Sequence, residues 1–395
     1  MLFSSNDAQF MARALRLAEK GRFTTSPNPN VGCVIVDESG HLLSEGFHLK
    51  AGEAHAEINA LNGVSGTAAN TTVYVTLEPC SHYGRTPPCC DALIRAGVGR
   101  VVIATEDPHP KVSGRGIKKL RDAGIQVDVG LFEAEAKRLN AGFIKRHTQG
   151  LPRVTLKLAA SLDGKTALSN GVSQWITGPL ARQDVQTHRA KSCAIVSGSG
   201  TVLADDPSLN VRSADFNAST YAKYPSLDNG SIDVRQPLRV IFDGRGQLHP
   251  ALKIFANIDK ASGYETSSGT LDFSHSNTLV INLVENQALT DAGIQQWQAP
   301  RKDEKINLTA SLEYLASLQI NDLWLEAGSR LAGAFIQEQL VDEFILYLAP
   351  KILGDKSFSL LNLPEFSDMT QVPELEITDT RMVGQDLKLT TRFKY

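Results

Sequence analysis

Residues 55–90 read HAEINALNGVSGTAANTTVYVTLEPCSHYGRTPPCC, and the prediction of function starts from this stretch. It places His55, Glu57, Cys80 and then Cys89 or Cys90 in the order that a zinc-dependent hydrolytic deaminase needs. A catalytic zinc site has three protein ligands and an open position, where bound water acquires a pKa of roughly 7. One imidazole and two thiolates supply these ligands, which leaves Glu57 as a proton shuttle. The pattern H-x-E followed by P-C is typical of zinc deaminases.

The second cysteine departs from this pattern. Tyr83 stands where P-C-x-x-C would place it, and the next cysteines come nine and ten residues after Cys80. The inserted segment SHYGRTPP carries His82 and Arg85, which indicates an anion-binding loop and a phosphorylated substrate. Two prolines then favour a helix start, where a cysteine in the first turn gains thiolate character. The residues alone leave Cys89 and Cys90 open as the third ligand. The competing interpretation is an ordinary helix histidine and cysteines that act as small core residues.

The residues before this stretch predict a packing helix and a hairpin. Apolar residues recur at helical spacing from Asn6 to Lys20, with Asn6 as the expected cap and Gly21 just past the end. The segment TTSPNPNVG is a predicted loop that leads into an apolar strand over residues 31–36. In that loop Asn28 is either a substrate contact or a turn-forming residue. The DESG turn closes a hairpin whose second strand runs to about Phe47.

The residues after it alternate between strands and helices, which predicts a sheet covered on both faces. The expected strands span residues 72–77, 101–104 and 125–129, and the expected helices span residues 91–96, 116–123 and 133–147. Gly150 and Pro152 cannot continue the last helix, so a domain boundary is expected near residue 150. Cys33 and Cys193 lie in apolar runs and are expected in the core.

The second half of the chain carries no zinc pattern. Gly198-Ser199-Gly200 lacks the third glycine of a dinucleotide fingerprint. Residues 322–327 predict an apolar strand, and the GSRLAGAFI that follows predicts a helix whose first backbone N–H groups either hold a phosphate or make a tight turn. Residues 213–235 predict a surface excursion, residues 344–348 a strand, and residues 375–383 and 387–393 a hairpin through Gly384. Taken alone, Trp175 is expected in the core.

Composition limits the class of protein. The chain has 395 residues, 42% of them hydrophobic and 21% charged, and a formal charge of −3, which favours two or three globular domains and no nucleic-acid or membrane partner. The amino terminus lacks a signal-peptide pattern, and no apolar run approaches the roughly 18 residues of a membrane span. Five cysteines, three of them clustered, fit a metal site in a reducing compartment. We therefore expect a cytoplasmic protein.

The chain closely resembles the bifunctional deaminase-reductase family of riboflavin biosynthesis over nearly its whole length. The resemblance is carried by TTSPNPNVGCVIV, HAEINAL, VTLEPCSHYGRTPPCCDALI, KLAASLDGKTA, SQWITG, TVLADDPSLNVR, EAGSRLAGA and LAPKILG. It implies an α/β fold, with a cytidine-deaminase-like three-layer domain over residues 1–149 and a dihydrofolate-reductase-like domain over residues 150–395. It also implies Zn²⁺ and NADPH as cofactors, a phosphorylated pyrimidine as substrate and a homo-oligomer, expected as a dimer.

The resemblance also implies the site residues. The zinc ligands are His55, Cys80 and Cys89, and Glu57 is catalytic. Substrate contacts of the deaminase are expected at Asn28, His48, His82 and Arg85. NADPH contacts are expected at Ala159, Trp175, Thr201, Asp205, Gly244, Gly328, Ser329, Arg330, Leu331, Ala332, Gly333 and Ala334. Substrate contacts of the reductase are expected at Ser173, Arg189, Leu209, Arg212 and Glu326. Lys157, Asp163 and Asp205 are the ionisable candidates for opening or protonating the ribose.

The sequence thus predicts a two-step enzyme. Its first domain would deaminate 2,5-diamino-6-(5-phosphoribosylamino)pyrimidin-4(3H)-one, and its second would reduce the ribosyl group of the product, 5-amino-6-(5-phosphoribosylamino)uracil, to ribityl. Two alternatives are a nucleoside or tRNA deaminase with an accessory domain, and a non-catalytic zinc-stabilised binding protein, for which four ligands would be expected.

Overall fold

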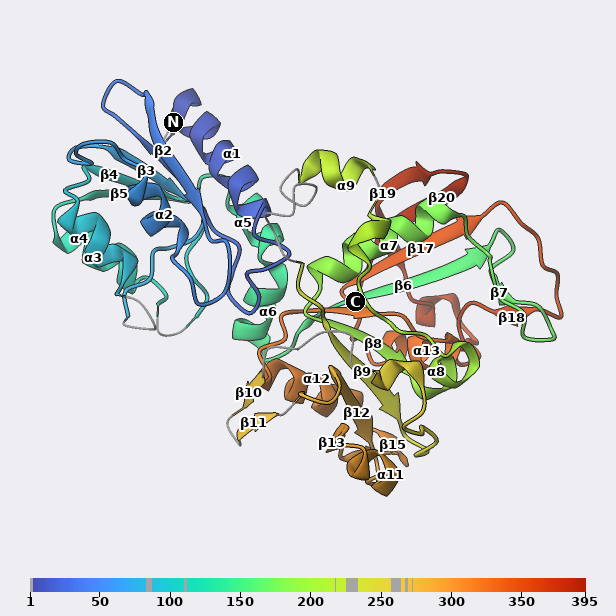
Figure 1. The fold of residues 1–395 in the computed structure, drawn as a ribbon. Coiled ribbons are helices and arrows are strands. Elements are labelled where there is room, and N and C mark those ends of the chain that lie inside the picture. Colours follow the sequence, from blue (N-terminus) through green and yellow to red (C-terminus); the bar gives the residue numbers. More distant parts are fainter. Residues whose placement is uncertain are drawn as a thin grey trace. The chain divides into compact units, whose positions relative to one another are not determined.

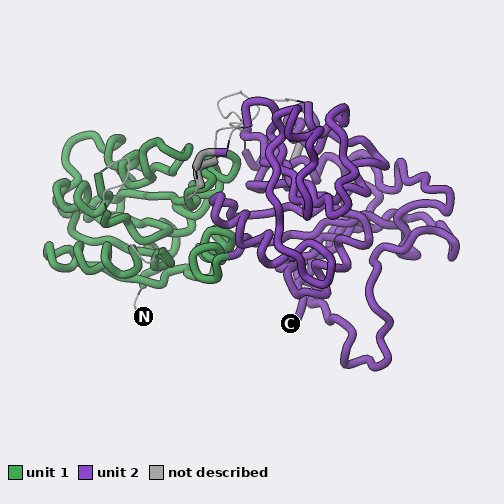
Figure 2. The backbone as a smooth tube through the Cα atoms, turned by 90° about the horizontal axis from the view of Figure 1, so that it is seen from below, with its two compact units in different colours: residues 1–150 green, residues 151–395 purple. Residues whose placement is uncertain are grey.

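The chain forms two compact units, residues 1–150 and residues 151–395 (Figure 2). The predicted boundary, between residues 149 and 150, lies one residue before the observed one. The computed structural model describes residues 3–82, 87–109, 112–216, 218–224, 234–256, 264–266, 269–271 and 273–395. No helix in these described segments has the length and hydropathy of a transmembrane span.

Unit 1 is built on one five-stranded sheet. Its elements are α1 (Ser5–Glu19), β1 (Gly32–Val36), β2 (Leu42–Phe47), α2 (Ala56–Asn62), β3 (Thr72–Val75), α3 (Cys89–Arg95), β4 (Arg100–Ile103), α4 (Arg115–Asp122), β5 (Gln126–Val129), α5 (Glu133–Leu139) and α6 (Ala141–Gln149). The strand order is β2-β1-β3-β4-β5. β1 is antiparallel to both of its neighbours, whereas β3, β4 and β5 are parallel. β1 is buried at all five positions, as expected for a strand in a sheet that helices cover on both faces.

The two faces of this sheet pack against different helices, which confirms the expected three layers (Figure 1). On one face, Met11 and Ala14 of α1 and Ala136 of α5 pack against alternate residues of β1, β3 and β4. On the other face, α2, α3 and α4 contribute the buried residues Ala56, Ala60, Cys90, Leu93, Ile117 and Leu120. Cys33 belongs to the second core and is fully buried, as predicted.

The cap of α1 differs from the prediction. Ser4, not Asn6, is the N-cap: its side chain accepts a hydrogen bond from the Asp7 backbone, and the Asp7 carboxylate accepts one from the Ser4 backbone. This reciprocal capping box satisfies two backbone donors at once. The Asp7 carboxylate also accepts a hydrogen bond at 2.8 Å from the hydroxyl of Tyr74, a residue of β3.

The predicted single helix over residues 133–147 is wrong, because it is broken at Asn140 into α5 and α6. The Asn140 side chain pairs with the backbone of Asn30, accepting from its N–H at 2.7 Å and donating to its carbonyl at 2.9 Å. This pairing with the loop before β1 accompanies a non-helical backbone at Asn140, with φ −115° and ψ 26°. A contact 110 residues away in sequence thus accompanies the helix break.

Unit 2 is built on one nine-stranded sheet with short two-stranded additions. Its elements are β6 (Arg153–Ser161), β7 (Lys165–Ala167), α7 (Pro179–Lys191), β8 (Ala194–Gly198), α8 (Ser199–Asp205), η1 (Ser213–Asp215), α9 (Ala218–Lys223), β9 (Leu238–Asp243), η2 (Lys253–Phe255), β10 (Tyr264–Thr266), β11 (Gly269–Leu271), β12 (Thr278–Asn282), α11 (Gln287–Asp291), β13 (Gln295–Gln298), β14 (Arg301–Lys302), β15 (Lys305–Ile306), α12 (Leu308–Ser317), β16 (Asp322–Leu325), α13 (Ser329–Gln337), β17 (Glu343–Ala349), β18 (Phe358–Ser359), η3 (Met369–Gln371), β19 (Leu375–Val383) and β20 (Asp386–Phe393).

The order of the large sheet is β13-β12-β9-β8-β16-β6-β17-β20-β19. The seven strands from β13 to β17 are parallel, and the hairpin β19–β20 joins β17 in antiparallel pairing. The predicted C-terminal hairpin therefore extends the sheet and forms its edge. Part of the predicted surface excursion over residues 213–235 forms η1 and α9, while residues 217 and 225–233 lie outside the described residues.

Helices cover both faces of this sheet as well (Figure 1). α12 and α13 pack on one face through Leu312, Phe335 and neighbouring apolar residues. α7 and α8 pack on the other through Val185 and Val202. The fold class is thus α/β in both units, as predicted.

Candidate functional site

Three potential metal ligands meet in unit 1. The ligand atoms of His55, Cys80 and Cys89 all lie within 4.8 Å of one another. The His55 Nδ1 atom is 3.6 Å from Cys80 Sγ and 3.3 Å from Cys89 Sγ. His55 is the N-cap of α2, Cys80 follows β3 and Cys89 is the first residue of α3. Among the described residues, this is the one such group of His, Cys, Asp and Glu side chains.

Cys89, not Cys90, joins the cluster. The Cys90 thiol points to the backbone carbonyls of Pro79 at 3.2 Å and Gly116 at 3.7 Å, inside the apolar core. Burial raises the pKa of that thiol well above its ordinary value, so it stays protonated. The helix start thus presents one cysteine to the cluster and packs the next one away from it.

The cluster favours a thiolate at Cys80. Hydrogen bonding from the Cys89 thiol lowers the pKa of Cys80 to about 4, and His55 and the Cys89 backbone N–H at 3.2 Å add to the effect. The pKa of Cys89 is correspondingly raised by its hydrogen bond to Cys80 and by burial. One imidazole nitrogen and two sulfurs in this geometry fit Zn²⁺, and three ligands leave a position for water.

Glu57 is buried beside the cluster and is not one of the three ligands. It lies in the first turn of α2 and is 3% exposed. Burial raises the pKa of its carboxyl to about 7, and the Cys80 charge contributes to the rise. A carboxyl with a pKa near neutrality both accepts and releases protons at neutral pH.

Asn28 and His48 form a pair near the cluster. The His48 ring lies edge-on to His55, with ring centroids 5.3 Å apart. His48 Nδ1 is 3.1 Å from the Ala54 carbonyl, so it carries the proton, and Nε2 accepts from the Asn28 amide at 3.0 Å. The NH₂ group of Asn28 therefore points at His48, and its Oδ1 is oriented as an acceptor.

The predicted phosphate loop is only partly described. His82 is exposed, and its ring stacks on His109 at a centroid distance of 6.3 Å. His109 in turn meets His147 of α6 at 4.6 Å. Arg85 lies outside the described residues.

Glu78 supports the cysteine loop and was not singled out from the sequence. Its buried carboxylate accepts four backbone N–H groups, from Asp107, Gly114, Gly116 and Ile117, at 2.8–3.2 Å. It thereby ties the segment before α4 to the residues just before Cys80. The sequence signal that could have identified Glu78 is its position directly before the Pro79-Cys80 dipeptide.

In unit 2, several residues predicted to bind NADPH lie just after the carboxyl ends of three central strands. β9, β8 and β16 are adjacent and parallel, and Gly244, Thr201 and Gly328 follow their carboxyl ends. Ligands bind in this position in open α/β sheets. The Gly328 N–H donates to Thr201 Oγ1 at 3.1 Å, and Gly328 is the N-cap of α13. The whole predicted segment from Gly328 to Ala334 therefore forms the start of that helix.

Three other predicted NADPH contacts are placed as follows. Ala159 lies on β6 and Asp205 is the exposed last residue of α8. Trp175 is 62% exposed, so the expectation from its residue type alone, that it lies in the core, is wrong. Arg182 of α7 lies over the Trp175 ring at 4.4 Å from its centroid, a cation–π contact.

Among the predicted substrate contacts, Arg189 and Glu326 form a buried ion pair. Arg189 donates through Nε to Glu326 Oε1 at 2.6 Å and through Nη2 to Oε2 at 2.9 Å, and its Nη1 donates to the Asn210 carbonyl at 3.1 Å. Its guanidinium thus joins Glu326 to the loop that holds Leu209. Arg212 is exposed and pairs with Asp215 at 2.5 Å, and Ser173 is partly exposed.

The three ionisable candidates differ in their surroundings. The Asp163 carboxylate accepts from Ser161 Oγ and from the backbone of Leu353 and Gly354 at 2.5–3.1 Å, so it anchors a turn. Burial lowers the pKa of the Lys157 ammonium. The negative charge of Glu326 raises that pKa and the positive charge of Arg189 lowers it. Asp205 is exposed, and partial desolvation raises the pKa of its carboxyl.

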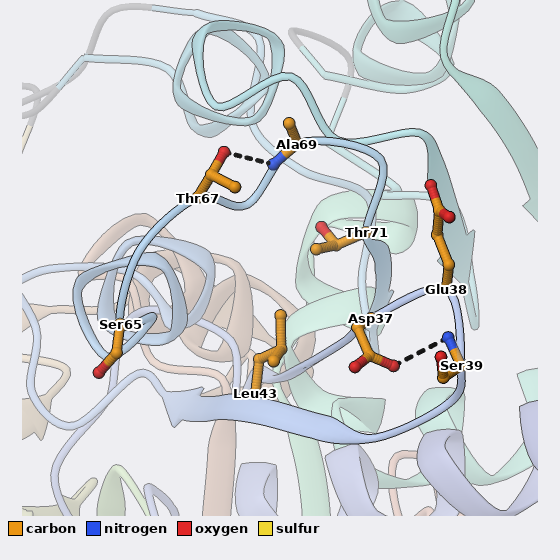
Figure 3. Close-up of a pocket in the computed structure, with 8 residues that line it drawn as sticks. All are labelled: Asp37, Glu38, Ser39, Leu43, Ser65, Thr67, Ala69 and Thr71. Atoms are coloured by element: carbon orange, nitrogen blue, oxygen red, sulfur yellow. Dashed lines mark hydrogen bonds between the residues drawn. The ribbon is translucent and has the colours of Figure 1, made fainter.

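A separate surface hollow of about 370 Å³ lies at the other end of β3 from Cys80 (Figure 3). It is lined by Asp37, Glu38, Ser39, Leu43, Ser65, Thr67, Ala69 and Thr71. The Asp37 carboxylate accepts the backbone N–H of Ser39 at 2.9 Å, and Thr67 accepts that of Ala69 at 3.1 Å. These groups stabilise turns, and none of the predicted site residues lines the hollow.

Comparison with known proteins agrees with this division. Residues 4–105 match the cytidine and deoxycytidylate deaminase zinc-binding region, and residues 152–389 match the RibD C-terminal domain. The fold and the site thus define a bifunctional enzyme that joins a zinc-dependent deaminase, a hydrolase, to an NADPH-dependent reductase, an oxidoreductase.

Relatives match over the full length. The riboflavin biosynthesis protein RibD of Escherichia coli is 46% identical over 384 residues, covering 97% of this chain and 98% of the relative, and that of Haemophilus influenzae is 46% identical over 389 residues, covering 98% of each. The structure of Acinetobacter baumannii RibD, form 1, superposes with a TM-score of 0.85 at 42% identity, covering 99% of both chains. The chain belongs to the RibD family and is a bifunctional riboflavin biosynthesis enzyme.

Proposed function

We propose that unit 1 deaminates 2,5-diamino-6-(5-phosphoribosylamino)pyrimidin-4(3H)-one and that unit 2 then reduces 5-amino-6-(5-phosphoribosylamino)uracil. The observation that carries the proposal is the His55, Cys80 and Cys89 cluster beside the buried Glu57, in a chain that also has the reductase unit. A Thermotoga maritima structure described as a diaminohydroxyphosphoribosylaminopyrimidine deaminase/5-amino-6-(5-phosphoribosylamino)uracil reductase is 31% identical, has a TM-score of 0.81 and covers 98% of this chain and 99% of its own.

In the deaminase step, His55, Cys80 and Cys89 would hold Zn²⁺, which when bound makes water a strong nucleophile at neutral pH. The Glu57 carboxylate would take one proton of the water and deliver it to the pyrimidine ring nitrogen, and would then pass the second proton, from the hydroxyl added at carbon, to the leaving amine. The net change is the replacement of C–NH₂ by C=O with release of ammonia. Burial of the Glu57 carboxyl favours its protonated form and so makes the carboxylate a stronger base for these transfers.

Asn28 orients the pyrimidine. Because its NH₂ group is engaged by His48, its Oδ1 accepts a hydrogen bond from an N–H of the ring or of an exocyclic amine. His48 thus acts by fixing the direction of the Asn28 amide. His82 and Arg85 are proposed to contact the phosphate of the substrate.

In the reductase step, NADPH would supply a hydride to C1′ of the ribose, the bond between C1′ and the ring oxygen would break, and a proton would go to that oxygen, which becomes a hydroxyl. The N-terminus of α13 is proposed to hold the pyrophosphate of the cofactor, since its first N–H groups are free of helical partners. Thr201, Asp205, Gly244, Ala159 and Trp175 would complete the cofactor site. Orientation of C1′ against the nicotinamide is the main contribution that the protein must make.

The substrate side of this step is proposed to rest on Glu326, with Ser173, Leu209 and Arg212 as further contacts. Charge and hydrogen bonds from Arg189 hold the pKa of Glu326 at about 2 against the effect of burial, so it is a carboxylate that accepts hydrogen bonds from ribose hydroxyls. Lys157, close to this carboxylate, is proposed as the proton donor.

We further propose a cytoplasmic homodimer. All five cysteines are free thiols, which suits a reducing compartment. The edge strand β19 exposes Ile377 and Met382, each 61% exposed, and unpaired edges are prone to pair with a second chain. Light scattering coupled to size exclusion would give the mass, and a monomer at micromolar concentration would contradict the dimer.

The test of the two-step reaction is incubation of zinc-loaded protein with the diaminopyrimidine substrate, with and without NADPH. We expect ammonia release without NADPH, and a mass gain of two hydrogens in the product once NADPH is added. Cytidine and tRNA serve as comparison substrates. Ammonia from either of these, and none from the diaminopyrimidine, would instead support a nucleoside or tRNA deaminase.

A further inference from the structure

The face of the unit 2 sheet that α7 covers carries a row of buried polar side chains. β16, β6, β17 and β20 are neighbours in that order, and they contribute Trp324, Lys157, Tyr347 and Lys388. Trp324 and Tyr347 are at most 1% exposed, and Lys388 is 5% exposed. Buried charged groups persist only where partners satisfy them, so the partners of this row identify what it does.

The first link of the row is between Trp324 and Glu326. The indole N–H donates to Glu326 Oε1 at 2.7 Å, the same oxygen that accepts from Arg189 Nε at 2.6 Å. Arg189 Nη2 donates to Oε2 at 2.9 Å. Three donors therefore occupy the inner side of the carboxylate and fix its rotation. Each carboxylate offers about four acceptor positions, so one remains on the Oε2 side for a ligand.

The second link holds the indole itself. The His188 ring stacks on Trp324 with centroids 4.8 Å apart and an interplanar angle of 9°. Lys388 Nζ lies 2.8 Å from His188 Nε2, and because an ammonium only donates, that nitrogen accepts and the imidazole is neutral. The Asp184 carboxylate in turn accepts from Lys388 at 2.5 Å and from the Tyr347 hydroxyl at 2.6 Å.

We propose that Trp324 is a positioning residue of the reductase site: its N–H orients the Glu326 carboxylate toward the ribosyl substrate, and the cluster of His188, Lys388 and Asp184 holds the indole. The inference rests on the proposed contact of Glu326 with the ribosyl group. A strand residue two positions before Glu326 supplies the donor, because side chains at that spacing lie on the same face of a sheet.

The test is Trp324→Phe, which keeps an aromatic ring for His188 to stack on and removes the N–H. We expect the KM for the ribosyl substrate to rise about 10-fold, in the range for loss of a hydrogen bond to a charged group, with the KM for NADPH and kcat changed less than about 2-fold. Trp297→Phe is the matched control. Trp297 lies on β13, the edge strand at the other end of the sheet from β19, and its ring stacks on that of Tyr314 with centroids 4.2 Å apart. We expect Trp297→Phe to change neither KM.

A double-mutant cycle with Glu326→Gln separates positioning from a structural role. If Trp324 acts through the carboxylate, Trp324→Phe adds less than about 2-fold to the KM of Glu326→Gln. Independent effects that multiply would overturn the proposal, as would a parallel rise in the KM for NADPH or an unchanged KM in Trp324→Phe. If Glu326→Gln alone leaves reduction unchanged, the proposed contact of Glu326 fails and the inference fails with it. Deamination by the same preparations reports that unit 1 is folded, and an unchanged KM for NADPH reports that unit 2 is folded.

Discussion

The two units assemble their sites over very different distances along the chain. In unit 1, His55 and Cys89 are 34 residues apart, and Cys80 and Cys89 only nine. In unit 2, Arg189 and Glu326 are separated by 137 residues, and Lys388 and His188 by 200. The metal cluster sits at the starts of two helices and the end of one strand, whereas the second site needs four adjacent strands and the helix that covers them.

This difference determines what kind of change each site tolerates. A site of three ligands and one carboxyl depends on a few chemical groups, so single substitutions should abolish its function without affecting the other unit. A site built from a buried hydrogen-bonded network shares its geometry among many residues, and losses there should be graded and non-additive. Four predictions test this comparison.

The largest effect is expected for Glu57→Gln. Loss of the proton shuttle should reduce deamination by roughly 10²–10⁴-fold, because general acid–base groups contribute that much, while reduction stays within 2-fold. Ammonia release and NADPH oxidation measure the two activities in one preparation. Zinc content is the control: an unchanged metal content ties the loss to the carboxyl, whereas a loss of zinc would make Glu57 a structural support of the ligands.

Two glycine substitutions should damage one unit each. A Cβ at Gly46 would lie 2.5 Å from the Ala60 nitrogen of α2, and a Cβ at Gly333 would lie 2.1 Å from the Asn362 carbonyl oxygen. Overpacking against backbone costs about 1–3 kcal/mol. Gly46→Ala should therefore lower the temperature at which deamination is lost, and Gly333→Ala the temperature at which reduction is lost. Equal loss of both activities in either variant would show that the units unfold together.

The Asp7 carboxylate should give unit 1 a pH-dependent stability. Burial opposes ionisation, but Arg100 at 2.7 Å, Ser4 and Tyr74 hold the pKa of Asp7 well below its ordinary value. A depressed folded-state pKa stabilises the fold above the unfolded pKa of about 3.9, and this stability is lost as the pH falls below it. Asp7→Asn should cost about 2 kcal/mol at pH 7. Thermal unfolding of the wild type and Asp7→Asn at pH 7 and at about pH 3, below the unfolded pKa, measures it, and a difference that grows toward acid would contradict the assignment.

The smallest effect is expected at the surface pair of Lys118 and Asp122 on α4. Their side chains are 75% and 62% exposed and 2.6 Å apart. Exposed pairs contribute roughly 0–1 kcal/mol, so Lys118→Ala should change the stability of unit 1 by less than about 0.5 kcal/mol. The same thermal measurement on Lys118→Ala gives the stability change of an exposed ion pair, with which the loss in Asp7→Asn is compared. A loss as large as that of Asp7→Asn would mean that exposed charge networks stabilise this unit.

Three differences between the predictions and the structure have different causes. Asn140 breaks a helix where it pairs with Asn30, 110 residues away. Ser4 caps α1 together with Asp7, whose carboxylate is held by Tyr74 and Arg100 from the sheet. Trp175 lies at the surface although its residue type favours the core. At Asn140 a partner distant in sequence prevailed over local helix preference. The capping box of Ser4 and Asp7 is instead a local pattern, three residues apart, that the sequence already carried. The exposure of Trp175 depends on the tertiary fold, which residue type alone does not register.

The sequence by itself determined the alternation of strands and helices, the sheet covered on both faces and two of the three proposed metal ligands, His55 and Cys80, because each of these depends on residues that are neighbours or nearly so in the chain. Only the tertiary structure decided that Cys90 faces the core, that Arg189 holds Glu326, and that Trp324 donates to the same carboxylate. Those contacts depend on strand order and register, and a buried charge takes its partner from whichever strand or helix the fold places against it.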